Sequence, residues 1–465
     1  MSSRIRSARS VIAAATVAVL FAWPTVLAQA PQQVPPAATP VAATTSPVTA
    51  PDSVTLILQP GDRPLLRVAF PALGGGALPD PAAVAAAREL EATLRDDLAT
   101  AGVFSVQGPA ELGVLTLTGD PERDFEQYRS LGNEVVLLAD LKLEGDRLAL
   151  EGRIYDLPSR QAILGKRYRG TYDLARRMAH TFADEIVLHF TGRRGLAMTA
   201  ISFYSDRDGD KEVYLMDYDG RNQRRVTAHK SISMSPAWSP GGESLAYVSY
   251  FGGTGPAIYL ADLASGRKSP VVTSGSLNSS PSFSPDGQRI AFARSLGSNV
   301  EIFVCDRDGS GLRQLTYSSA IDTNPAWSPS GREIAFTSSR GTGRPQIYVT
   351  DADGANVRRI TFTGDYNDGA AWSPDGTRIA YSSRQESGAF GVSITNLVDL
   401  ATKLLLSGGG SHEHPTFSPD GHRIAFASTR SGKTQIFVMN DDGAALRPLT
   451  ADGNNYSPDW SGYTP

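Results

Sequence analysis

From about residue 200 onward, short apolar runs alternate with clusters of Gly, Asp, Pro and Ser, and this pattern repeats along the chain. Repeats of roughly 20 to 50 residues are typical of propellers and solenoids. An aromatic anchor occurs six times, at successive spacings of 45, 44, 45, 45 and 43 residues. The anchors are PAWSPGG from Pro236, PSFSPDG from Pro281, PAWSPSG from Pro325, AAWSPDG from Ala370, PTFSPDG from Pro415 and PDWSGYT from Pro458.

Each repeat has the pattern of four short strands. Seven residues after each of the first five aromatics a second apolar run begins, as in Ile290 to Phe292. The Pro-Asp-Gly between the two runs predicts a tight turn, because Pro fixes φ and Gly accepts positive φ. A third run such as Ile302 to Cys305 follows, then an Asp-Gly turn and a fourth run that ends in Leu-Thr or Ile-Thr. Four strands in roughly 44 residues is the size of one propeller blade.

The two ends of the repeat array complement each other. Ile201 to Phe203 has the second-strand pattern without a Trp-Ser-Pro before it, and Trp460-Ser461 has the first-strand pattern close to the last residue. We expect the last fragment to complete the first blade, because a closed ring removes free sheet edges. Residues 199–465 are therefore predicted to form an all-β six-bladed β-propeller with split-blade (N- plus C-terminal) closure.

Residues 54–192 show a different, mixed pattern, which predicts an α+β N-terminal domain ahead of the propeller. Apolar residues recur on a helical period in two long stretches and in alternation in shorter ones. The expected strands are 65–72, 103–106, 134–143, 147–155 and 163–171, and the expected helices are 81–101, 122–131 and 173–190.

The N-terminus has the pattern of an export signal followed by a tether. Three arginines precede a 13-residue apolar run, Val11 to Trp23, and small residues lead to Ala28. The run is shorter than the roughly 20 residues that span a bilayer, so residues 1–28 are predicted to be a signal peptide and we expect no direct membrane span. Residues 29–53 are rich in Ala and Pro, and residues 29–51 contain no charged side chain, which predicts a disordered tether. The one cysteine, Cys305, leaves no internal disulfide.

Charge and motifs argue against several functions. The chain has 48 acidic and 44 basic residues, a net charge of −4, which disfavours nucleic-acid binding. A serine-peptidase interpretation fails because no G-x-S-x-G is present. Carboxylate catalysis would require acidic residues beside the inner-strand aromatics, where we expect Ala, Ser or Thr. We therefore expect that the protein is not an enzyme.

Two motifs have the residue types of metal sites. His412 and His414 stand at i, i+2 and could share a metal, but the sequence offers no obvious third ligand. The acidic run Asp206 to Glu212 resembles a calcium loop, yet Lys211 stands where that loop needs Gly. We expect a polar loop at the first place, a hairpin turn at the second, and no metal or other cofactor.

Several segments resemble the TolB family, periplasmic components of the Tol-Pal system of Gram-negative envelopes. The similar segments are RPLLRVAFPAL near Arg63, DLATAGVF near Asp97, MDYDGRNQ from Met216 and SPAWSPGGESLAYVSY from Ser235. The resemblance implies a non-catalytic, monomeric periplasmic protein. It implies two partners, the peptidoglycan-associated lipoprotein Pal on one mouth of the propeller and TolA at the N-terminal region, in support of outer-membrane integrity and cell division.

Carried over by position, the resemblance places the Pal contact in the loops before the aromatic-Ser-Pro strands. These residues are Asn278, Ser279, Ser280, Asp322, Thr323, Asn324, Asn367, Asp368, His412, Glu413 and His414. The TolA contact falls on the strand-like residues Val54, Leu56 and Leu58, although here about 25 Ala/Pro-rich residues precede them. The alternative is an exported propeller that binds a glycan or peptide, or assists a separate enzyme. That alternative predicts exposed aromatic residues at the channel mouth.

Overall fold

The computed structural model describes residues 65–75, 78, 80–118, 120–253 and 255–463. The predicted signal peptide and tether, and with them Val54, Leu56 and Leu58, lie outside the described residues. None of the helices in the described part of the chain is long and apolar enough to cross a membrane.

The first domain is built on a five-stranded sheet of order β2-β1-β3-β4-β5. Strand β1 pairs in parallel with β2 and β3, whereas β3, β4 and β5 form an antiparallel meander. Its elements are β1 (Leu66–Ala69), α1 (Pro81–Thr100), β2 (Phe104–Gln107), α2 (Pro109–Leu112), α3 (Pro121–Ser130), β3 (Val135–Glu144), β4 (Arg147–Asp156), β5 (Gln161–Gly170), the 3-10 turn η1 (Tyr172–Leu174) and α4 (Ala175–Thr191).

Helices α1 and α4 pack together and bury the faces that their helical periods predict. Asp80 caps α1 by accepting a hydrogen bond from the Ala83 amide at 2.8 Å. Phe182 of α4 fits against the sheet because position 152 of β4 is a glycine, where an added Cβ would lie 2.1 Å from the Phe182 ring. The buried apolar residues of the two helices include Leu90, Leu94, Leu98, Met178, Phe182 and Ile186.

Some of the predictions for this domain were wrong. The first strand is only four residues long, and the short helix α2 was not expected. Leu174 falls within the predicted helix 173–190, but it lies in the 3-10 turn before α4 and is 39% exposed. The mixed α+β character itself is confirmed.

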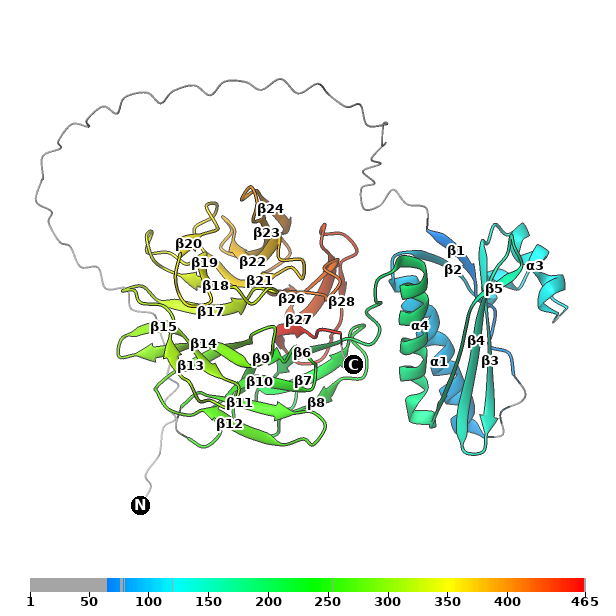
Figure 1. Cartoon of the computed structure of the whole chain (residues 1–465), viewed down its shortest axis with the longest axis horizontal. Helices are drawn as coiled ribbons and strands as arrows, with labels where there is room; N and C mark the ends of the chain where they lie inside the picture. Colours follow the sequence, from blue (N-terminus) through cyan, green and yellow to red (C-terminus); the bar gives the residue numbers. More distant parts are fainter. Residues whose placement is uncertain (1–64, 76–77, 79, 119, 254, 464–465) are drawn as a thin grey trace, which may run out of the picture. The chain divides into compact units, whose positions relative to one another are not determined.

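Six four-stranded sheets follow and are arranged around a common centre (Figure 1). Each is one blade, in which neighbouring strands run antiparallel. Blade 1 is β29 (Asn455–Trp460), β6 (Ala200–Ser205), β7 (Glu212–Asp217) and β8 (Arg224–Arg225); blade 2 is β9 (Ser233–Trp238), β10 (Ser244–Ser249), β11 (Ala257–Asp262) and β12 (Lys268–Val272); blade 3 is β13 (Asn278–Phe283), β14 (Arg289–Leu296), β15 (Asn299–Asp306) and β16 (Arg313–Gln314). Blade 4 is β17 (Asp322–Trp327), β18 (Glu333–Ser338), β19 (Gln346–Asp351) and β20 (Arg358–Arg359); blade 5 is β21 (Asn367–Trp372), β22 (Arg378–Arg384), β23 (Phe390–Asn396) and β24 (Thr402–Leu406); blade 6 is β25 (His412–Phe417), β26 (Arg423–Ser431), β27 (Lys433–Asn440) and β28 (Arg447–Pro448).

Blade 1 joins the two ends of the propeller sequence. Its innermost strand β29 pairs antiparallel with β6, with Asn455 opposite Ser205 and Trp460 opposite Ile201. The Trp460 indole donates to Thr199 Oγ1 at 2.9 Å, which fixes the tryptophan against the start of the propeller. The predicted split-blade closure and the six-bladed fold are confirmed.

The second strand of every blade carries one fully buried aromatic ring. A buried side chain of this size stabilises a fold by roughly 1.5–3 kcal/mol relative to an exposed one. Six such rings therefore supply much of the apolar packing between blades. They are Phe203, Tyr247, Phe292, Phe336, Tyr381 and Phe426.

The described residues, from 65 to 463, belong to one compact unit, and largely buried polar and charged groups connect α1 and α4 with blade 1. Arg176 donates to Asp217 at 2.8 Å, and His180 contacts Asp97 at 2.7 Å. Tyr218 also donates to Asp97, at 2.8 Å. Burial on its own would lower the pKa of His180, but the Asp217 carboxylate, 3.7 Å from Nε2, and the hydrogen-bonded Asp97 carboxylate raise it to about 9. His180 is therefore charged at neutral pH, and the charge is stabilised by both carboxylates.

Candidate functional site

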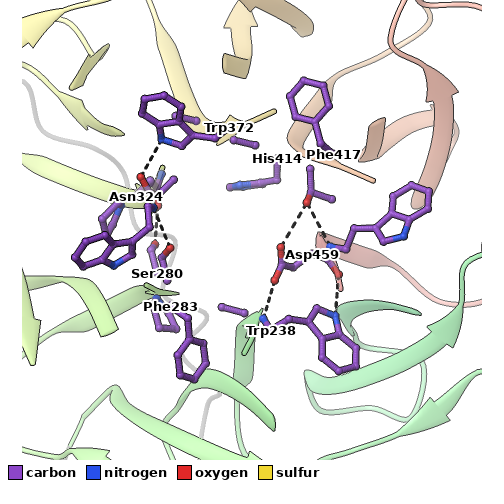
Figure 2. Close-up of a pocket in the computed structure, with 18 of the residues that line it drawn as sticks. Trp238, Ser280, Phe283, Asn324, Trp372, His414, Phe417 and Asp459 are labelled. Atoms are coloured by element: carbon purple, nitrogen blue, oxygen red, sulfur yellow. Dashed lines mark hydrogen bonds between the residues drawn. The ribbon is translucent and has the colours of Figure 1, made fainter. Parts of the chain in front are cut away.

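The innermost strands of the six blades enclose a cavity of about 380 Å³ at the centre of the propeller. We call the end at which these strands begin the channel mouth. Equivalent positions recur in each strand, so the site is described by the first, second and third residue of each inner strand. Figure 2 shows side chains from several blades converging on this cavity.

The first residues of the inner strands hold the strands in place. Asn278, Asp322, Asn367 and His412 are each 0% exposed. They were expected in loops, but each begins a strand, because its side chain bonds to the neighbouring hairpin or connection. The Asp322 carboxylate, for example, accepts from Ser338 Oγ at 2.6 Å. These four residues therefore position the mouth and present no side-chain surface at it.

His412 illustrates why the metal interpretation fails at this strand. Its Nε2 lies 2.9 Å from the Gly408 carbonyl oxygen, which can only accept, so Nε2 carries the proton. Its Nδ1 then accepts from Ser428 Oγ at 2.9 Å. Burial lowers the pKa of His412, which favours this neutral form. Both ring nitrogens are thus occupied within the fold. Across the described ranges, no group of three or more His, Cys, Asp or Glu residues is arranged to hold a metal ion.

The third residue of every inner strand has a left-handed backbone conformation, with positive φ. Five of these residues have a side chain, with φ between 43° and 54°, and Gly369 has φ 68°. The strand pairing shifts register at each of these places, so each is a β-bulge. Left-handed side-chain residues are uncommon and cost energy, yet they recur around one ring and line the cavity. The five are Ser235, Ser280, Asn324, His414 and Ser457.

Side chains of the second and third positions join neighbouring blades. Ser280 Oγ donates to Asn324 Oδ1 at 2.6 Å, and Asn324 Nδ2 donates to Asp368 Oδ1 at 2.6 Å. Thr337 also donates to Asp368 Oδ1, at 2.7 Å. Blades 3, 4 and 5 are thereby connected across the mouth.

Seven of the eleven predicted contact residues remain partly exposed at the mouth. They combine hydroxyl, amide, carboxylate and imidazole groups, which suits hydrogen bonding to another protein surface. The seven are Ser279, Ser280, Thr323, Asn324, Asp368, Glu413 and His414.

The acidic run that resembles a calcium loop is the hairpin between β6 and β7, as expected. The Gly209 amide donates to the Asp206 carbonyl to form the turn. The Asp206 carboxylate accepts from the Asn454 amide at 2.7 Å, and buried Glu212 accepts from Thr227 at 2.5 Å. Both carboxylates stabilise the fold.

One carboxylate in the channel was missed. Asp459 stands directly before Trp460, where the other repeats have Ala237, Ser282, Ala326, Ala371 and Thr416, so the expectation of only Ala, Ser or Thr was wrong. Aligning the last, truncated repeat would have found it. Asp459 accepts from the Trp238 amide at 2.7 Å and so links blade 1 to blade 2 (Figure 2). Although Asp459 is partly exposed in the channel, burial raises the pKa of its carboxyl to about 6.

Comparison with known proteins gives consistent results. The model of the TolB β-propeller domain matches residues 187–464. The Tol-Pal system protein TolB of Geobacter sulfurreducens is 38% identical over 161 residues, 35% of this chain and 37% of that protein. The protein of the same name from Geobacter metallireducens is 39% identical over 173 residues, 37% and 39% of the two chains. These matches span less than two fifths of the relatives' length. The crystal structure of TolB from Acinetobacter baumannii has a TM-score of 0.72 and 26% identity, and covers 86% of this chain and 97% of that one.

The raised pKa of Asp459 predicts how the stability of the protein depends on pH. Its folded-state pKa lies above the ordinary 3.8, so the stability linked to its proton is full below about pH 4 and is lost as pH rises through about 6. We expect wild type to gain about 1–2 kcal/mol relative to Asp459→Asn between pH 7 and pH 4. Denaturant unfolding followed by tryptophan fluorescence measures this difference. A difference that does not change with pH would contradict the assignment.

Proposed function

The chain belongs to the TolB β-propeller family, and from this premise we propose that it is a non-catalytic, periplasmic component of a Tol-Pal system that docks the lipoprotein Pal. The observation that carries the proposal is the channel mouth, where seven partly exposed polar residues lie on equivalent strands held in place by buried neighbours. Relatives named Tol-Pal system protein TolB support the choice of system.

The mouth suits docking because its backbone is preorganised. Buried first residues and bulged third residues fix where each second-position side chain lies. A preorganised surface loses little conformational entropy when it binds, which improves affinity. Glu413 and Asp368 come from neighbouring blades and offer acceptors to donors on the partner.

Asp459, the one acidic residue among the described residues that line the cavity, fits docking better than catalysis. Acid/base hydrolysis by carboxylates uses two groups with separate roles. At the positions equivalent to Asp459 the other five repeats have Ala, Ser or Thr. The hydrogen bond from the Trp238 amide gives Asp459 a structural task, the connection of blades 1 and 2.

We further propose that the N-terminal region contacts TolA. Val54, Leu56 and Leu58 alternate with Thr55 and Ile57 in an apolar run rich in β-branched residues, which suits addition to the sheet edge of a partner. Bound to Pal at the mouth and to TolA at this segment, the protein would link the two envelope partners and so support outer-membrane integrity and division.

The mouth proposal predicts the result of a pulldown from detergent-solubilised envelope. Wild type should recover a peptidoglycan-associated lipoprotein, and a Glu413→Gln/His414→Asn variant should bind it about tenfold more weakly. Asn is chosen at position 414 because it tolerates the left-handed backbone. Asp353→Asn/Asp442→Asn, at exposed turns on the other end of the blades, is the matched control. Failure of the folded wild type to recover any lipoprotein would overturn the assignment.

The TolA proposal predicts that deletion of residues 52–60 abolishes recovery of TolA and leaves lipoprotein recovery unchanged, since the mouth is untouched. Replacement of the same nine residues by a Gly/Ser segment controls for linker length. Retention of TolA by both variants would place its contact elsewhere on the chain.

A further inference from the structure

Large apolar side chains are exposed along one part of the propeller rim. Their exposed fractions run from 41% to 77%, although most side chains of this type are buried in a folded domain. We call them the apolar arc: Ile232 (41%), Phe251 (48%), Leu296 (44%), Tyr317 (77%), Ile321 (52%) and Phe362 (62%).

The strand pairing places the apolar arc at the channel mouth. Ile232 and Ile321 directly precede inner strands β9 and β17, and their carbonyls accept from the Tyr250 and Ser339 amides at the far ends of the paired strands. Phe251 lies in the hairpin between β10 and β11, and Leu296 is the last residue of β14, directly before the hairpin to β15. Tyr317 and Phe362 lie in connections into the next inner strand, so all four are at the same end of the blades.

The arc occupies only one side of the rim. Its residues come from blades 2 and 3 and from the connections into blades 4 and 5. On the other side, the connection into blade 6 reads Ser407-Gly-Gly-Gly-Ser411. Among the described residues, the mouth ends of blades 6 and 1 expose no large apolar side chain. The rim is thus asymmetric although the blades repeat.

The two most exposed aromatics, Tyr317 and Phe362, bury little surface in the fold. Each stands directly after a buried threonine. The threonines hold these connections against the third strands. Thr316 Oγ1 accepts a hydrogen bond from the Ile302 amide at 2.9 Å, and Thr361 Oγ1 accepts one from the Ile347 amide at 3.0 Å. A serine after either threonine would leave these hydrogen bonds intact.

Most of the arc lies in uncharged segments. Four mouth-side segments, from blades 2 and 3 and the connection into blade 4, contain no Asp, Glu, Lys or Arg and hold Phe251, Leu296, Tyr317 and Ile321; they are residues 250–256, 273–277, 295–300 and 317–321. The other two arc residues have a cation nearby: the Arg359 guanidinium lies 5.2 Å from the centre of the Phe362 ring, and Lys230 is two positions before Ile232. Exposed apolar side chains that gather on one part of a surface, with aromatic anchors among them, are typical of protein interfaces. The absence of charge from these four segments indicates that the facing partner surface is apolar as well, since desolvating an unpaired charge there would be costly.

We propose that the apolar arc anchors the folded periplasmic domain of the Pal lipoprotein, through an uncharged apolar patch on that domain, so that Pal sits off-centre over blades 2 to 4. This inference rests on the proposed function and specifies which part of the mouth carries the binding energy. Continuity supports it, because Ile321 is adjacent in sequence to Asp322, Thr323 and Asn324 of the mouth.

The test measures binding of the lipoprotein's periplasmic domain, made without its lipid, by calorimetry. Tyr317→Ser/Phe362→Ser should weaken binding by roughly tenfold or more, with an unchanged melting temperature. Val398→Ser/Leu404→Ser is the matched control, because both side chains are exposed (87% and 44%) on blade 5 away from the mouth. Wild-type affinity should change less than about threefold between about 0.1 M and 0.5 M salt, because few charges are paired.

The outcomes separate this inference from the proposed function. If wild type does not bind the domain at all, the proposed function fails and the arc with it. A second outcome is that wild type binds, Glu413→Gln/His414→Asn loses affinity, and Tyr317→Ser/Phe362→Ser keeps it. Docking at the mouth would then hold, and the arc inference would be wrong. Loss of binding to isolated peptidoglycan by the Tyr317/Phe362 variant, with lipoprotein affinity intact, would instead make the arc a glycan surface and overturn the inference.

Discussion

The pairing of β29 with β6 is the constraint on which the propeller depends. Without β29, the inner edge of blade 1 would expose unpaired backbone groups. Blade 6 would also lose the strand through which it contacts blade 1. Three further contacts act on the same junction: the Trp460 indole on Thr199, the Asp459 carboxylate on the Trp238 amide, and the Thr416 hydroxyl on the Trp460 amide. Closure therefore sets the relative positions of all six inner strands, and with them the shape of the mouth.

The inner strands divide packing and surface chemistry between successive residues. The aromatic at the end of each strand belongs to the core between blades, the first residue anchors the strand, and only the second and third face the mouth. The left-handed third residue makes this division possible, because a bulge breaks the simple alternation of a flat strand. Substitutions at second positions such as Glu413 can thus alter the mouth without disturbing the fold.

Much of the fold could be predicted from the sequence, because each repeat carries its own turns and apolar periods. The number of blades and the split closure followed from the anchors alone. The site could be predicted less well. In the sequence, Asn278 and His412 have the appearance of solvent-exposed polar residues in loops. The structure shows that both are buried and that their side chains form hydrogen bonds with residues distant in the sequence. Tyr317 and Phe362 resemble core aromatics, since a sequence does not reveal which side of a connection faces solvent. Their exposure also meets the aromatic criterion of the glycan-binding alternative, which binding measurements must separate from docking.

The most direct test of this account is to shorten the chain so that it ends at Gly453, which removes β29. Lipoprotein affinity and the cooperativity of unfolding, followed through Trp238, Trp327 and Trp372, are then measured together. We predict that both are lost, because an open ring leaves neither a fixed mouth nor a continuous core, and that a synthetic peptide of residues 454–465 restores both. Unchanged affinity and cooperative unfolding of the shortened chain would contradict the claim that ring closure builds the site.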